Sequence, residues 1–83
     1  MPYFVYILRS EKDGSYYIGH TSNPEDRLER HNQGRSQYTR TKVPWKLIHY
    51  EKFESKSDAM RREYEIKGKK GRRYIDILVR ASR

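Results

Sequence analysis

Five side chains in this sequence are of types that together suit the cleavage of a phosphodiester bond. Tyr6 and Tyr17 lie in two strand-like segments, Arg27 and His31 lie four residues apart in a helix-like segment, and Glu63 lies in a later one. An arginine presents a fixed fork of donors to phosphate oxygens, and a histidine takes or gives a proton near neutral pH. A carboxylate supplies the hard oxygen ligands that Mg²⁺ prefers. The chemistry therefore depends on which elements bring these side chains together.

The two tyrosines meet if their segments form a hairpin of one particular register. Residues 3–9 and 16–20 are rich in aromatic and β-branched side chains, and a turn-like tetrad, 11–14, lies between them. With this tetrad as the loop, Tyr6 lies opposite Gly19, which leaves room for a phenol, and Tyr17 becomes a diagonal neighbour of Tyr6 on the same face. A slip of one residue would put the phenols on opposite faces. The alternative is two ordinary sheet tyrosines.

A helix over residues 24–32 is expected to carry the arginine and the histidine. Asn23 is suited to cap its first turn, a proline follows at the first helical position, and Gly34 is a suitable C-terminal stop. Because helical residues four apart share a face, Arg27 and His31 project from the same side. For either residue alone, a solvated basic helix surface is the alternative.

A second helix, over about residues 57–67, places a carboxylate where an apolar side chain would be expected. Glu63 falls on one stripe with Ala59 and Ile66, partly against the core. An ionised carboxylate is costly there unless a cation, a metal or several donors satisfy it. The alternative to a metal site is an internal ion pair with a base such as Arg27 or Arg62.

In chain order, the sequence contains Phe4-Val5-Tyr6, Tyr17-Ile18-Gly19, Arg27, His31 and the run Ala-Met-Arg-Arg-Glu-Tyr-Glu-Ile-Lys at residues 59–67. This pattern resembles the GIY-YIG nuclease domain over nearly the whole chain. It is most similar to the small stand-alone, excision-endonuclease-like members, which also carry loops like those at residues 32–34 and 38–40. The departure is in the first triplet, where Phe4 and Val5 replace Gly and Ile and the tyrosine is kept.

The resemblance implies an α+β fold, a three-stranded antiparallel sheet flanked by helices in the order β-β-α-β-α-α. It also implies hydrolysis of a nucleic-acid phosphodiester with one divalent metal ion, Mg²⁺ in the first place and Mn²⁺ as the alternative. Position by position, Tyr6 and Tyr17 match the tyrosines that line the site and orient the attacking water. Arg27 matches the arginine that steadies the scissile phosphate, His31 a proton acceptor, and Glu63 the metal-binding glutamate.

The identity of the general base stays open at this point. A phenol with an unperturbed pKa of about 10 is a poor base at neutral pH unless a metal or an arginine lowers that pKa. His31 is the other candidate.

The charge of the chain favours a polyanionic partner. The sequence has 19 Lys and Arg against 11 Asp and Glu, for a net charge of +8, and basic residues concentrate over 61–73. Tyr38 is suited to stack on an unpaired base, whereas Trp45 opens the strand-like run 45–53 and is interpreted as core. The residues expected to contact nucleic acid are Arg35, Tyr38, Arg40, Lys42, Arg62, Lys67, Lys69 and Lys70.

The 83 residues are expected to form a single domain, 1–83, closed by a helix over 71–81 on which Tyr74, Ile75, Ile77 and Leu78 complete the core. The absence of cysteine fits a reducing compartment, and no signal sequence or apolar span is recognisable, so a cytoplasmic protein without membrane contact is expected.

These observations lead to the hypothesis of a metal-dependent endonuclease that acts on nucleic acid, DNA in the first place. Its specificity would come from its basic surface, a homodimer or an external targeting partner, and a role in DNA repair follows by analogy only. One alternative is a nucleic-acid-binding module on the same scaffold with weak or no catalysis. Another is an interaction protein that binds acidic proteins through residues 61–73.

Overall fold

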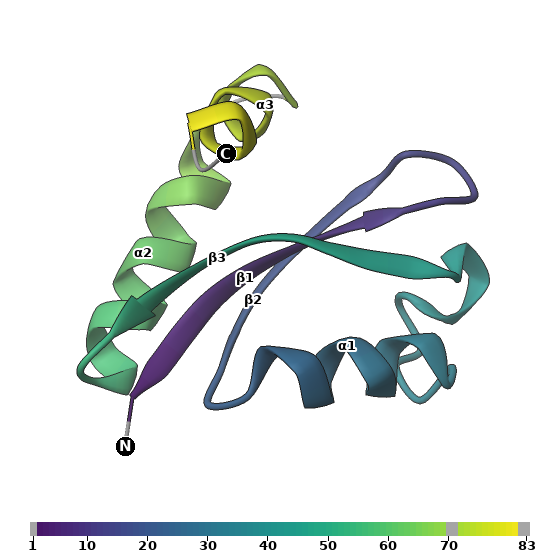
Figure 1. The fold of residues 1–83 in the computed structure, drawn as a ribbon, viewed down its shortest axis with the longest axis horizontal. Helices are drawn as coiled ribbons and strands as arrows, with labels where there is room; N and C mark the ends of the chain where they lie inside the picture. The colour runs from purple at the N-terminus through teal and green to yellow at the C-terminus, as the bar shows by residue number, and fades with distance from the viewer. Residues whose placement is uncertain (1, 70–71, 82–83) are drawn as a thin grey trace.

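The computed structural model describes residues 2–69 and 72–81 and consists of one antiparallel sheet with helices on both faces (Figure 1). The strands lie in the order β2-β1-β3, so the first strand is central. This architecture confirms the expected α+β fold and its order of elements. The strands are β1 (Tyr3–Ser10), β2 (Tyr16–Thr21) and β3 (Trp45–Phe53); the helices are α1 (Pro24–Asn32), a short 3-10 turn η1 (Arg40–Lys42), α2 (Lys56–Gly68) and α3 (Arg72–Ala81).

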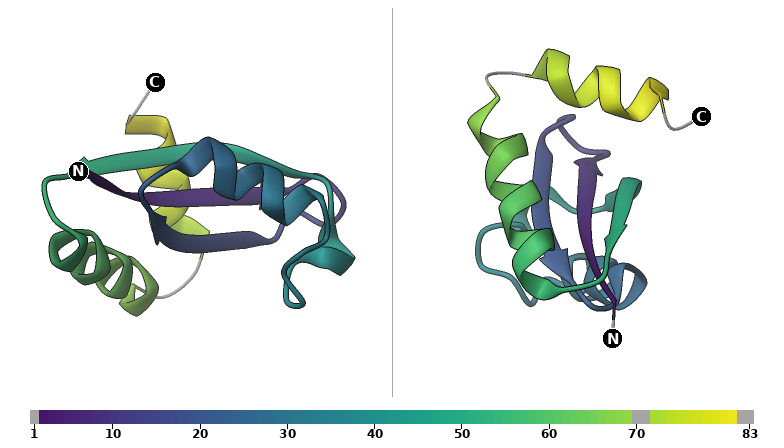
Figure 2. Two further views of the ribbon diagram at one scale, coloured as in Figure 1. Left: turned by 90° about the horizontal axis from the view of Figure 1, so that it is seen from below. Right: turned by 90° about the vertical axis from the view of Figure 1, so that its left-hand side faces the viewer.

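The central strand separates two apolar clusters, because successive side chains of a strand point to opposite faces. Val5 and Ile7 pack with α2 and α3, whereas Tyr6 and Leu8 pack with Trp45 and with the α1 side. Figures 1 and 2 show α2 and α1 on opposite sides of the sheet. Tyr6 therefore faces α1, the helix that carries the arginine and the histidine.

The hairpin has the register expected from the tetrad loop. Tyr6 pairs with Gly19, and Leu8 pairs with Tyr17. The Ser10 amide donates to the Ser15 carbonyl at 2.8 Å, which closes the loop over residues 11–14. The two phenols consequently share one face of the sheet.

Local capping explains where the helices begin. The Asn23 side chain accepts a hydrogen bond from the Asp26 amide at 3.1 Å, and Ser55 accepts one from the Asp58 amide at 3.2 Å. After α1 the chain turns at Gly34, whose φ of +76° lies in the left-handed region that favours glycine. The second helix is longer than expected by one residue at each end.

The closing helix differs from the expectation at one position. Ile75 is buried and Leu78 is half-buried, but Ile77 is 55% exposed, because its position turns it away from the sheet. Gly71, the expected first residue of this helix, lies outside the described residues. Trp45 is 3% exposed and donates through Nε1 to the Thr39 carbonyl at 3.0 Å, which confirms it as a core residue. Among the described residues, no helix has the length and apolar character needed to cross a bilayer.

Candidate active site

Three aromatic rings from β1, β2 and α1 meet on the α1 side of the sheet. The ring centroids of Tyr6 and Tyr17 lie 6.2 Å apart, and those of Tyr17 and His31 lie 4.7 Å apart. Tyr6 is only 2% exposed. Burial, and after it the neighbouring Tyr17, raises the pKa of the Tyr6 phenol above its ordinary value. Tyr6 is therefore protonated at neutral pH and cannot act as a base unless it passes its own proton on.

His31 lies next to Tyr6, within hydrogen-bond distance of its hydroxyl. Its Nε2 lies 3.2 Å from the Tyr6 hydroxyl, and its Nδ1 lies 2.7 Å from the Thr39 hydroxyl. Burial, and then the positive charge of Arg27, lowers the pKa of His31, so the ring is neutral at neutral pH. We assign the proton to Nδ1, which then donates to Thr39 while Nε2 accepts from Tyr6.

Arg27 brings an uncompensated cation to the same place. Its Nε is buried without a hydrogen-bond partner, the one such side-chain nitrogen or oxygen found in the described part of the chain. Its charge acts on both Tyr6 and His31. A buried donor without a partner is costly, and an anionic oxygen would satisfy it. The arrangement therefore suits a phosphate beside the tyrosines.

Glu63 approaches the tyrosines from the other face, at the edge strand β2. Its Oε1 lies 2.6 Å from His20 Nδ1, its Oε2 lies 2.6 Å from Lys67 Nζ, and its side chain is 17% exposed. Burial alone would raise the pKa of Glu63, but the hydrogen bonds from Lys67 and His20 outweigh it and lower the pKa below its ordinary value. Glu63 is thus ionised at neutral pH, and its charge also helps to raise the pKa of Tyr6. The alternative interpretation of Glu63, an internal ion pair, is therefore present in the structure. Its partners are Lys67 and His20, whereas the sequence suggested a base such as Arg27 or Arg62.

At this place the protein offers a divalent ion one ionised carboxylate, that of Glu63. The described residues contain no group of three or more histidine, cysteine or acidic side chains that could enclose a metal. Mg²⁺ is often bound through one or two carboxylates and keeps several waters. The residues therefore fit a Mg²⁺-like ion at Glu63, provided that the Lys67 ammonium moves off Oε2.

Two residues of the site were not predicted from the sequence. His20 follows the second tyrosine motif and contacts Glu63, and Thr39 is fully buried behind His31. Strand alternation could have placed His20 on the α2 face, where a partner for Glu63 was needed. Nothing in the local pattern identifies Thr39, because it lies in a loop, eight residues beyond His31.

The residues expected to contact nucleic acid are only partly brought together. The Tyr38 ring is 69% exposed and lies 6.1 Å from the Tyr17 ring, next to the aromatic cluster. Tyr38 and three lysines line an open pocket of about 450 Å³, which we call the basic groove; the lysines are Lys42, Lys67 and Lys69. Arg35 and Arg40 are exposed, and Lys70 lies outside the described residues.

Arg62 stands apart from this groove. Its side chain is 19% exposed, and its guanidinium contacts the Glu51 and Glu65 carboxylates and the Tyr74 hydroxyl. These contacts join α2 to β3 and α3. The structure thus gives Arg62 partners within the fold, and its expected contact with nucleic acid stays a prediction.

Comparisons with known proteins show which family this chain resembles over most of its length. The family model described as the GIY-YIG catalytic domain matches residues 2–75. The UPF0213 protein SH2523 of Staphylococcus haemolyticus is 52% identical over 66 residues, 78% of this chain and 79% of that protein. A UPF0213 protein of Staphylococcus aureus strain Mu3 is 44% identical over 66 residues with the same coverage, 78% and 79%.

A solved structure shares the fold. The solution NMR structure of the UPF0213 protein BH0048 from Bacillus halodurans is 40% identical, covers 98% of this chain and 85% of that one, and superposes with a TM-score of 0.61. The names of these relatives assign no reaction, whereas the family model spans all five candidate catalytic positions.

Replacing Gly19 is expected to disturb the aromatic cluster. A Cβ at Gly19 would lie 2.6 Å from the Tyr6 phenol oxygen, so Gly19→Ala forces the ring to move. We expect the free energy of unfolding to fall by about 1–3 kcal/mol, as is usual for overpacking. Urea denaturation of both proteins measures this difference.

Gly68→Ala is the matched control. A Cβ at Gly68 would meet no atom within 4 Å, so this variant is expected to be as stable as the wild type or more stable by up to about 1 kcal/mol. Equal losses of stability in the two variants would contradict the close packing of Tyr6 over Gly19.

Removing Lys67 is expected to raise the pKa of Glu63. Lys67 lowers this pKa through its hydrogen bond and its charge, so Lys67→Ala shifts the titration toward the ordinary value. A carboxylate with a depressed folded-state pKa stabilises the fold above its unfolded pKa and loses this contribution as the pH falls through the folded pKa. Carbon NMR of the Glu63 carboxyl group during an acid titration gives the pKa directly.

Lys56→Ala, at the exposed start of the same helix, serves as the control and should leave the Glu63 titration in place. An unchanged Glu63 pKa in Lys67→Ala would show that the ion pair does not form in solution.

Proposed function

Because this chain belongs to the GIY-YIG family, whose domain is that of a nuclease, we propose that it is a metal-dependent endonuclease acting on DNA. The observation that carries the proposal is the buried Nε of Arg27, which has no hydrogen-bond partner and belongs to a cation whose charge acts on Tyr6 and His31. A structural arginine in a fold this small would be expected to have an acidic or carbonyl partner. A scissile phosphate supplies the missing acceptor.

Arg27 is the residue to which we assign stabilisation of the phosphate. Hydrolysis places additional negative charge on the phosphate oxygens in the transition state, and a fixed donor aimed at those oxygens stabilises this charge. The buried Nε is already desolvated, so the interaction requires little further loss of water. The guanidinium fork then also orients the phosphate against the two tyrosines.

The proton of the attacking water is assigned a path through Tyr6 to His31. The raised pKa of Tyr6 excludes a standing phenolate, but the phenol can give its proton to His31 Nε2 at 3.2 Å while its oxygen takes one from the water. Burial keeps His31 neutral and ready to accept. Thr39 holds the ring through Nδ1, so Nε2 stays directed at Tyr6.

Glu63 is assigned the metal. A divalent ion bound there would help to neutralise the developing phosphate charge and favour ionisation of a bound water. His20 and Lys67 hold the carboxylate ionised and oriented before any ion arrives. Lys67 has to yield its contact with Oε2, because an ammonium and a metal compete for the same oxygen.

A second candidate function rests on that same contact. With both carboxylate oxygens already paired, Glu63 is satisfied without a metal, as in a module that binds nucleic acid and does not cut it. Such a module would bind DNA in a salt-sensitive manner and show no response to magnesium.

Cleavage of a panel of labelled substrates tests the proposal. Wild-type protein should cut at least one of single-stranded, duplex, flapped and branched DNA when magnesium or manganese is present, and none in EDTA. Arg27→Ala and Glu63→Ala should each lower kcat by about a hundredfold to a thousandfold, the usual effect of losing one stabilising group.

Arg30→Ala and Glu65→Ala are matched controls, because these exposed residues lie on the same two helices as Arg27 and Glu63. Both should keep wild-type rates. Binding of DNA by the wild type without cleavage under any metal condition would reject the endonuclease in favour of the binding module.

The pH profile tests the proton path. Since burial and Arg27 lower the pKa of His31, the neutral form persists below the ordinary value of 6.5. The value of kcat/KM should therefore rise with pH, reach half its maximum below 6.5 and stay level through neutral pH. The residual activity of His31→Ala should lack this acid limb; an identical limb in that variant would assign the proton acceptor elsewhere.

A further inference from the structure

Cationic side chains that the candidate active site does not use line a cavity on the α3 side of the hairpin. It has a volume of about 480 Å³ and lies where the hairpin and β3 face α3. Four of its lining side chains are cationic and two are acidic: Arg9, Lys46, Arg72 and Arg80 against Glu11 and Asp76. We call this place the hairpin cavity.

Two of these cations face each other on neighbouring strands. Arg9 of β1 and Lys46 of β3 are direct cross-strand partners, and both are exposed. Like charges directly opposite in a sheet destabilise it. No ion pair within residues 2–69 and 72–81 joins either of them, or Arg80, to a carboxylate. An anion between the strands would turn this repulsion into attraction.

The two acids of the cavity offset only part of its positive charge. Asp76 accepts the Tyr16 hydroxyl at 2.5 Å, so one of its oxygens is already occupied. Glu11 lies exposed at the start of the hairpin loop. Four cations against two acids leave the cavity with an excess of positive charge.

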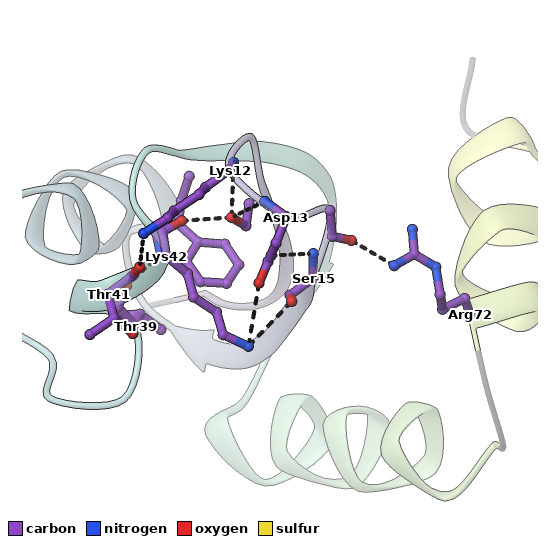
Figure 3. A network of polar contacts seen from close by, with 10 residues as sticks. Lys12, Asp13, Ser15, Thr39, Thr41, Lys42 and Arg72 are labelled. Carbon is purple, nitrogen blue, oxygen red and sulfur yellow. Dashed lines mark hydrogen bonds and ion pairs between the residues drawn. The ribbon is translucent and has the colours of Figure 1, made fainter.

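One wall of the cavity is fixed in place before any ligand binds. The Arg72 guanidinium carbon lies 4.7 Å from the centre of the Tyr16 ring, and its Nη1 donates to the Gly14 carbonyl at 2.8 Å. Figure 3 shows this contact between α3 and the tip of the hairpin, with Lys42 joined to the opposite side of the same loop. The rim is thus formed by residues from distant parts of the chain that hold one another.

The hairpin cavity adjoins the basic groove. Tyr16 and Arg72 line both of them. The groove in turn reaches the candidate active site through Tyr38, whose ring lies by Tyr17, and through Lys67, which contacts Glu63. Cationic side chains therefore lie on both sides of the Tyr16–Arg72 contact, with Lys67 and Lys69 in the groove and Arg9 and Lys46 in the cavity.

We propose that the hairpin cavity is a second phosphate-binding site, which holds a backbone phosphate of the nucleic acid whose scissile bond lies at Tyr17 and Glu63. The substrate then passes around the β2 edge and contacts both faces of the sheet. This inference rests on the proposed function, since it takes the nucleic-acid substrate as the ligand. Arg9 and Lys46 act in binding and have no part in the chemical step.

Binding of labelled DNA in EDTA, followed by fluorescence anisotropy over a range of salt concentrations, tests the site without requiring catalysis. The double variant Arg9→Gln/Lys46→Gln should bind more weakly. Its plot of log affinity against log salt should be shallower by roughly 0.7 to 0.9 for each phosphate that the variant no longer neutralises. In cleavage assays its KM should rise and its kcat at saturating substrate should stay at the wild-type value.

Two further variants separate the site from net charge and from misfolding. Lys52→Gln/Lys56→Gln removes the same charge from exposed lysines that do not line the cavity, and should keep the wild-type slope. Arg9→Lys/Lys46→Arg keeps both charges and should restore binding. Thermal melting should show that Arg9→Gln/Lys46→Gln is at least as stable as the wild type, since the substitution removes a repulsion.

Each outcome distinguishes this inference from the proposed function. A wild-type slope in Arg9→Gln/Lys46→Gln, with cleavage intact, overturns the second site and leaves the endonuclease. A shallower slope in a protein that never cuts supports the second site and rejects the endonuclease. If this variant binds DNA normally but no longer binds a polyglutamate peptide, the cavity serves an acidic protein and the inference is overturned.

Discussion

The close packing of the Tyr6 phenol over Gly19 is the contact on which the candidate site depends. It requires the register in which Tyr6 lies opposite Gly19, and strand alternation then determines the face of every side chain in the hairpin. Tyr17 consequently joins Tyr6, while His20 points to the other side and contacts Glu63. A side chain larger than hydrogen at Gly19 would displace the phenol that His31 contacts.

The sheet also separates the aromatic residues and Arg27 of the candidate site from Glu63. On the α1 face lie a protonated phenol, a neutral histidine and an unpartnered arginine, all within a largely buried cluster. On the α2 face lies an ionised carboxylate between two bases. Only at an edge strand can groups from both faces act on one substrate, and β2 is an edge strand. Both sets of groups are therefore nearest to each other at this edge of the sheet.

Part of the charge of the chain forms ion pairs that join its elements. Glu51 of the third strand and Glu65 of the second helix hold the fold through their contacts with Arg62. Glu51 keeps a lowered pKa, because its hydrogen bonds from Arg62 and His49 outweigh the effect of burial. Arg9, Lys46 and Arg80 of the hairpin cavity form no ion pair with a carboxylate in the described part of the chain. Together with the net charge of +8, these cations favour a polyanionic partner.

Much of the fold and most of the candidate site could be predicted from the sequence, because they depend on local rules. Tetrad length and strand alternation determined that Tyr6 faces Gly19, helical spacing determined that Arg27 and His31 share a face, and the apolar stripe marked Glu63 as half-buried. The tertiary structure decided the partners: His20 and Lys67 for Glu63, Thr39 for His31, and Glu51 and Glu65 for Arg62. It also decided that Arg9 meets Lys46 across strands far apart in the chain. Side-chain partners are chosen by proximity in space, and a pattern along the chain specifies spacing only within one element.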